Sequence, residues 1–93
     1  MSLRLSKIVK RDIGADPEIK GVTADSRKVK PGFLFAALPG SKADGAAFAA
    51  KAVEAGAAAV IADQDLNLSV PTVICRDPRR GYALAAANFW GRQ

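Results

Sequence analysis

The fold of this chain depends on residues 22–45, which read VTADSRKVKPGFLFAALPGSKADG. The pattern predicts a short strand, a polar and basic corner, a tight turn, an apolar strand, and a glycine-flanked polar loop that leads into a helix. Two such loops can bring a hydroxyl, cations and free backbone N–H groups to one edge of a small sheet, where they could hold an anion. Turn residues beside strands more often only turn the chain, so the spacing alone is weak evidence for a site.

Each part of this stretch has a local physical reason. Asp25 and Ser26 are residue types that bond to nearby backbone in turns, so both are typical of a corner. Lys30-Pro31-Gly32 predicts a tight turn, since proline presets the first central position and glycine accepts the positive φ of the second. The continuous apolar run of residues 33–38 is typical of a strand that is covered on both faces.

The rest of the chain predicts a small α/β domain. Residues 46–55 should form a helix that ends at Gly56, and residues 58–62 should form a strand. Together with the strand before them, they predict a strand, helix, strand unit with a right-handed, parallel crossover. The expected architecture is a small mixed sheet with flanking helices. Its other elements are a short helix at residues 5–9, an extended segment at 19–24, a strand at 72–75, and a helix that begins at Asp77-Pro78 and buries Tyr82, Ala85, Ala86, Phe89 and Trp90. We expect Trp90 to pack in the core rather than stack on a base.

Composition limits the class of protein. Ninety-three residues suit one small domain, and a content of 49% hydrophobic but only 6% aromatic residues predicts a core of small side chains. The formal net charge of +5 favours anionic partners without saying which. Because the basic residues form no contiguous run, ordinary solvated surface is the simpler interpretation than a nucleic-acid patch.

The single cysteine and the absence of long apolar runs are evidence about the cellular compartment of the protein. Cys75 cannot form an intrachain disulfide, which fits a reducing environment, and with no histidine in the chain it is a small buried hydrophobe rather than a nucleophile. No stretch reaches the roughly 20 apolar residues that span a bilayer. We therefore expect a soluble, cytoplasmic monomer that binds neither membrane nor nucleic acid.

The chain resembles the amino-terminal domain of the Mur ligases, the ATP-dependent enzymes that add amino acids to the UDP-muramoyl peptide precursor of peptidoglycan. The resemblance covers roughly residue 21 to the end. It is strongest to the tripeptide synthetase (MurE) branch, because the branch that adds a dipeptide (MurF) is expected to have a histidine where this chain has Ala46. The matching positions are the run Ala24-Asp25-Ser26-Arg27, the turn Lys30-Pro31-Gly32, residues 34–38, the loop 40–45, Phe48, Ala52 and Gly56-Ala57.

The resemblance also implies a set of substrate-binding residues. In the family the serine of the Asp-Ser-Arg run contacts the UDP moiety, and the second loop holds the uracil end. Carried to this sequence, the expected contacts are Ala24, Ser26, Ser41, Lys42 and Ala43. Arg27 either steers the anion or pairs with Asp25, and we favour the pairing.

The same resemblance predicts that this chain binds but does not catalyse. Ligases of the family form an acyl phosphate with ATP and Mg²⁺, which needs a glycine loop with lysine and magnesium ligands. No such pattern and no histidine occurs here, so we expect no catalytic residue, no metal and no cofactor in residues 1–93, with ATP and Mg²⁺ in the parent enzyme and its ATP loop beginning a little beyond Gln93.

The leading hypothesis is a domain that recognises the UDP part of UDP-N-acetylmuramoyl-L-alanyl-D-glutamate for a ligase that adds meso-diaminopimelate or L-lysine. The alternatives are a MurF-type substrate domain, a small basic nucleic-acid-binding module, and an interaction module without a small-molecule ligand. The nucleic-acid alternative lacks an aromatic stacking platform and a recognition motif.

Overall fold

The structure is a computed structural model that describes residues 3–5, 8, 17–37, 45–64 and 67–90. Its described strands are β1 (Leu3–Arg4), β2 (Glu18–Ile19), β3 (Gly21–Thr23), β4 (Phe33–Ala36), β5 (Ala59–Ala62) and β6 (Thr72–Ile74). The helices are the short 3₁₀ helix η1 (Ser26–Lys28), α2 (Gly45–Glu54) and α3 (Pro78–Trp90).

The described strands form two sheets. Strands β3, β4, β5 and β6 lie side by side in the order of the sequence, and each pairs in parallel with the next. Strands β1 and β2 form a separate antiparallel pair, in which Leu3 lies opposite Ile19. The α/β class is therefore confirmed. We expected one mixed sheet, but the parallel and the antiparallel pairings occur in two separate sheets.

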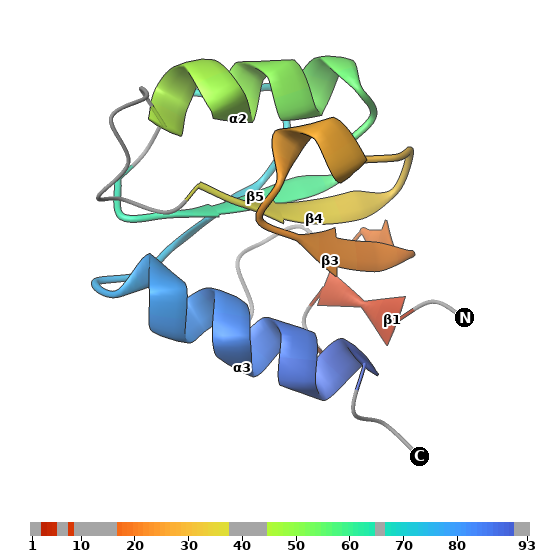
Figure 1. Cartoon of the computed structure of the whole chain (residues 1–93), viewed down its shortest axis with the longest axis vertical. Helices are drawn as coiled ribbons and strands as arrows, with labels where there is room; N and C mark the ends of the chain where they lie inside the picture. The colour runs from red at the N-terminus through yellow and green to blue at the C-terminus, as the bar shows by residue number, and fades with distance from the viewer. Residues whose placement is uncertain (1–2, 6–7, 9–16, 38–44, 65–66, 91–93) are drawn as a thin grey trace.

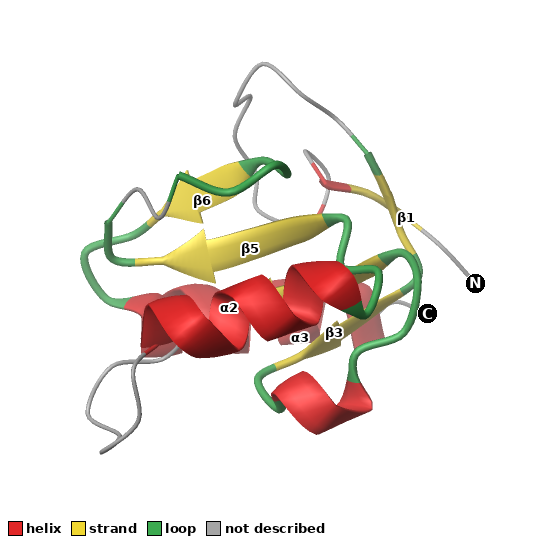
Figure 2. Ribbon diagram, turned by 90° about the horizontal axis from the view of Figure 1, so that it is seen from above, coloured by secondary structure: helices red, strands yellow, loops and turns green. Residues whose placement is uncertain are grey.

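The parallel sheet lies between two layers. Figure 1 shows α2 over one face and α3 under the other, and Figure 2 shows β5 and β6 running in the same direction. The connection from β4 to β5 contains α2, which gives the predicted strand, helix, strand unit. Leu68 and Val70, between β5 and β6, pack on the same cluster as α2 does.

Alternating side chains of the central strands fill the two layers. In β4, Leu34 and Ala36 join the cluster that contains Ala85 and Phe89 of α3, whereas Phe35 joins the cluster that contains Ala49 and Ala52 of α2. Strand β5 alternates in the same way, and all four of its residues are buried. A strand covered on both faces needs an apolar residue at every position, which is why residues 33–38 form a continuous apolar run.

Two glycines with positive φ fix the approach to β4. The Phe33 N–H donates to the Lys30 carbonyl oxygen over 3.1 Å, and Gly32 has a φ of 89°, so the predicted turn is confirmed. Gly56 ends α2 with a φ of 112°, and a Cβ at this position would lie 2.7 Å from the Pro31 Cα. Its carbonyl oxygen accepts a hydrogen bond from the Gly32 N–H, so the two turns support each other.

The last helix begins as the sequence predicts and ends differently. Asp77 Oδ1 accepts a hydrogen bond from the Arg80 N–H at 3.3 Å, and Pro78 is the first helical residue. Phe89 is buried beneath the sheet, but Trp90 is 56% exposed, so the expectation that Trp90 packs in the core is wrong. Successive helical positions lie about 100° apart, and the sheet covers the side of α3 that carries Phe89.

The amino-terminal residues close the core at the α3 side. Leu5 and Ile8 are fully buried in the α3 cluster, and the Asn88 side chain donates a 2.7 Å hydrogen bond to the Ile8 carbonyl oxygen. Of the short helix that the sequence predicts at residues 5–9, the structure describes only Leu5 and Ile8. None of the described helices combines the length and the apolar character that crossing a bilayer requires.

Candidate functional site

The candidate site follows from the direction of the strands. Because β3 and β4 are parallel neighbours, with Val22 opposite Leu34 and Thr23 opposite Phe35, the chain leaves both strands at the same edge of the sheet. The carboxyl ends of parallel strands are a common place for ligands in open α/β sheets. The corner at residues 24–28 follows β3 at this edge, and the chain that joins β4 to α2 follows β4.

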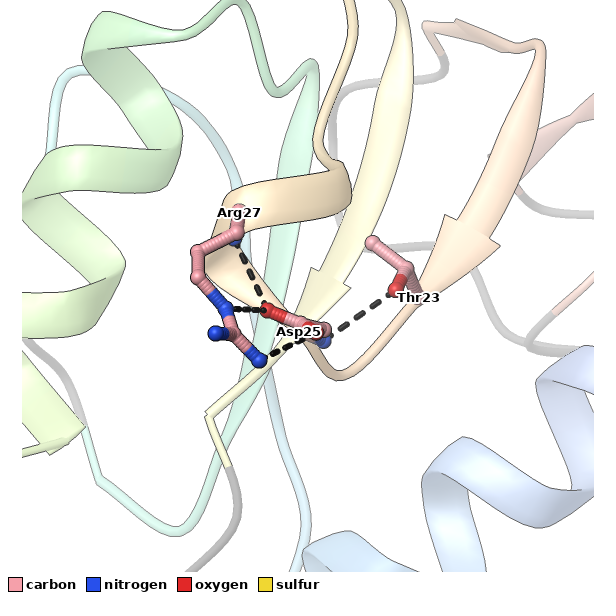
Figure 3. Close-up of polar contacts among 3 residues, drawn as sticks. All are labelled: Thr23, Asp25 and Arg27. Atoms are coloured by element: carbon pink, nitrogen blue, oxygen red, sulfur yellow. Dashed lines mark hydrogen bonds and ion pairs between the residues drawn. The ribbon is translucent and has the colours of Figure 1, made fainter.

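Hydrogen bonds to Asp25 fix the corner after β3 (Figure 3). Its Oδ1 accepts from the Arg27 N–H at 2.9 Å and from Arg27 Nε at 3.2 Å, and its Oδ2 accepts from Arg27 Nη2 at 3.3 Å. The Asp25 carbonyl oxygen accepts from the Lys28 N–H, which closes η1. These hydrogen bonds therefore stabilise the backbone turn that contains Ser26.

The same contacts set the charge of the corner. Hydrogen bonds from the Arg27 side chain, and then from its backbone N–H, lower the pKa of the Asp25 carboxyl from its ordinary value. The carboxylate in turn raises the pKa of Arg27. The pairing that we favoured for Arg27 is confirmed, and Lys28 and Lys30 are also exposed near this corner.

The structure describes two of the five predicted contact residues. Ala24 is half-buried and packs on the α3 cluster, which gives it a structural role as well. Ser26 is the first residue of η1, directly after its cap, Asp25. The other three positions, Ser41, Lys42 and Ala43, lie outside the described residues.

Sequence reasoning missed Thr23, which supports the corner from the end of β3. Its hydroxyl accepts a 3.1 Å hydrogen bond from the Asp25 N–H, and the residue is buried (Figure 3). The signal was available, since a hydroxyl residue two positions before a turn residue can bond to its backbone. At the same edge, exposed Asp63 follows β5 and exposed Arg76 follows β6 soon after, and neither was a candidate from sequence.

The described residues were expected to contain no metal site. They contain no cluster of three or more histidine, cysteine or acidic side chains that could hold an ion. Cys75 is half-buried and packs on the α3 cluster, in agreement with the role of a small apolar residue. We therefore assign no step that involves ATP or Mg²⁺ to the described residues.

Comparison with known families identifies the chain. The family described as "Mur ligase family, catalytic domain" matches residues 18–88. The chain belongs to the Mur ligase family. The matched residues include β3 with the corner that follows it and β4 with the turn that precedes it, so the predicted resemblance is confirmed there.

Among Mur ligases with curated names, several relatives are similar over most of the chain. The UDP-N-acetylmuramoyl-L-alanyl-D-glutamate--2,6-diaminopimelate ligase of Caulobacter vibrioides is 57% identical over 95 residues, which cover 100% of this chain and 20% of the relative. The ligase of the same name from Brucella melitensis is 54% identical over 82% of this chain and 16% of the relative. The chain thus spans about a fifth of the length of the Mur ligases that it matches.

A solved Mur ligase confirms the fold. A crystal structure of MurF from Acinetobacter baumannii superposes with a TM-score of 0.71 at 25% identity, over 90% of this chain and 19% of that protein. Its sequence similarity is lower than that of the diaminopimelate ligases, which favours the MurE branch over the MurF branch.

Proposed function

We propose that this chain is the part of a Mur ligase that holds the UDP end of UDP-N-acetylmuramoyl-L-alanyl-D-glutamate. The main support is that the corner containing Ala24 and Ser26 and the segment from β4 to α2, which contains Ser41, Lys42 and Ala43, follow adjacent parallel strands. Both therefore begin at one edge of the sheet, where a ligand could contact both. The ordered corner around Asp25 lowers the cost of binding, because it requires no rearrangement of this backbone.

The reaction of the parent enzyme is part of this proposal. The relatives named above are 2,6-diaminopimelate ligases, so we infer that the parent joins diaminopimelate, rather than L-lysine, to the UDP-muramoyl dipeptide. ATP and Mg²⁺ would bind to parts of the parent beyond residues 1–93, and this chain alone would bind substrate without catalysis. Residues 1–93 then form one substrate-binding domain.

The cellular setting is inferred from the sequence. The single cysteine and the sugar-nucleotide substrate both suit the cytoplasm. We propose that the chain works there as a monomer in one polypeptide with the catalytic parts of the enzyme.

A titration with three ligands tests the proposal. Isothermal calorimetry of the chain with UDP, with the complete UDP-muramoyl dipeptide and with a random oligonucleotide should show saturable binding to the first two. Ser26→Ala should weaken this binding about tenfold, since a lost hydrogen bond to a charged ligand costs about 1.5 kcal/mol. Ser69→Ala, which changes an exposed serine between β5 and β6, is the matched control.

Two results would contradict the proposal. Equal weakening by Ser26→Ala and Ser69→Ala would remove Ser26 from the site. Binding to the oligonucleotide alone, with affinity that falls steeply as salt rises, would support the nucleic-acid alternative that the net charge of +5 leaves open.

A further inference from the structure

The side of α3 that faces away from the sheet has Arg79 and Arg80 in its first turn and is apolar from Ala83 onward. Its inner side contributes Pro78, Ala85 and Phe89 to the buried residues. In Figure 1, α3 forms the lower layer, and no described element lies below it. Beyond the arginines of the first turn, the exposed residues of α3 are Ala83, Leu84, Ala87 and Trp90, which we call the α3 outer face.

The composition of this face is unusual for a helix in water. These four residues follow the three- and four-residue spacing of one helical side, with Ala87 in the middle. Residues 81–90 contain no charged side chain, and their only amide, Asn88, bonds to Ile8 in the interior. The charged residues of α3, Arg79 and Arg80, are confined to its first turn, whereas in α2 the exposed charges Lys51 and Glu54 lie in the second half of the helix.

The largest side chain of the face is held in place. The Trp90 ring packs edge-on against the buried Phe89 ring, with centroids 4.6 Å apart and an interplanar angle of 88°. Leu84 is 53% exposed one and a half turns earlier. An exposed tryptophan in a stretch without charged side chains is typical of a protein interface centre, where aromatic residues are enriched and charges are depleted.

The third exposed large apolar residue does not belong to this face. Ile74 lies in β6 next to Val73, and Val73 points into the α3 cluster. Neighbouring strand residues point to opposite sides, so Ile74 points away from α3. The α3 outer face is therefore a separate apolar patch that does not include Ile74.

We infer that the α3 outer face docks against the rest of the polypeptide in a complete Mur ligase. The relatives named above are about five times as long as this chain, so most of their polypeptide lies outside the aligned region. The α3 outer face ends at Trp90, the last described residue, so it adjoins the end of the described chain. The inferred contact does not depend on nucleotide binding, because it uses the helix and not the edge after β3.

A chimera tests this contact without measuring activity. In this chimera, residues 1–93 replace the segment of the Caulobacter vibrioides ligase that aligns with them over 95 residues. Hydroxyl-radical footprinting with mass spectrometry compares the modification rates of Leu84 and Trp90 in the chimera and in the isolated chain. Both rates should fall several-fold in the chimera, while the rate of Ile74 should stay the same.

Two alanine substitutions locate the contact. Ala87→Glu places a charge in the middle of the face, whereas Ala50→Glu changes an exposed alanine of α2 and is the matched control. Ala87→Glu should return the modification rate of Trp90 in the chimera to that of the isolated chain, and Ala50→Glu should not. Circular dichroism of each isolated variant checks that the fold is kept.

Three outcomes would overturn the inference. The first is equal modification of Trp90 in the chimera and in the isolated chain. The second is protection of Trp90 that Ala87→Glu leaves unchanged. The third is a dimer of the isolated chain, seen by sedimentation and lost in Ala87→Glu, which would assign the face to a second copy instead.

Discussion

Asp25 joins the fold to the proposed site at the scale of a single residue. It caps η1, pairs with Arg27 and receives support from the Thr23 hydroxyl through its own N–H. All of these contacts lie within five residues of sequence, so the corner can form before the sheet edge is complete. The charge of Arg27 is thereby partly neutralised by Asp25.

The lowered pKa of Asp25 makes a part of the stability depend on pH. Since the folded state favours the carboxylate, this contribution is present above the ordinary aspartate pKa of about 3.9 and is lost as the pH falls through the lower folded pKa. Asp25→Asn should therefore be less stable than the unchanged chain near pH 6, and the difference should shrink below about pH 4. Urea unfolding at a series of pH values measures it.

Asp63→Asn is the control for this prediction, because Asp63 is an exposed aspartate at the same edge of the sheet. A difference between Asp25→Asn and the unchanged chain that grows as the pH falls below 4 would have the wrong sign and would contradict the assigned ion pair.

At the scale of the elements, the sequence predicts best where one physical cause dominates. Strands β4 and β5 were predicted because burial on both faces requires continuous apolar runs, and the turn before β4 because only glycine accepts its φ easily. Trp90 was misplaced because an alanine-rich helix has apolar residues on every side, so its pattern does not show which side meets the sheet. The antiparallel β1 and β2 pair, with two residues in each strand, is too short to leave a pattern.

Two positions of α3 should separate its inner side from its outer face. Phe89→Ala should lower the free energy of unfolding by about 3 to 5 kcal/mol, because it leaves a cavity among fully buried residues. Leu84→Ala should change it by only about 0.5 kcal/mol in the isolated chain, since Leu84 is largely exposed. Urea unfolding measures both differences.

The milder Phe89→Leu keeps this comparison possible if the alanine variant does not fold. A loss for Leu84→Ala as large as that for the Phe89 variants would mean that the outer face is already covered in the isolated chain, against the observed exposure.

At the scale of the whole molecule, sequence and structure contribute different parts of the account. The sequence predicted the α/β class, the family and the order of the two loops, because these depend on local patterns and on motif residues. It did not predict that all four strands of the main sheet are parallel, a consequence of how the crossovers pack. Because the strands are parallel, the end of β3 and the end of β4 lie at one edge of the sheet. The proposed site depends on this arrangement.

The most direct test of the nucleotide site is the map of amide chemical-shift changes when UDP is titrated into ¹⁵N-labelled chain. The account predicts saturable changes at residues 24–28 and 40–45, with little change in the second half of α3. Saturable changes centred on α3 or on the far ends of the strands, or no changes with UDP or the complete UDP-muramoyl dipeptide, would contradict it.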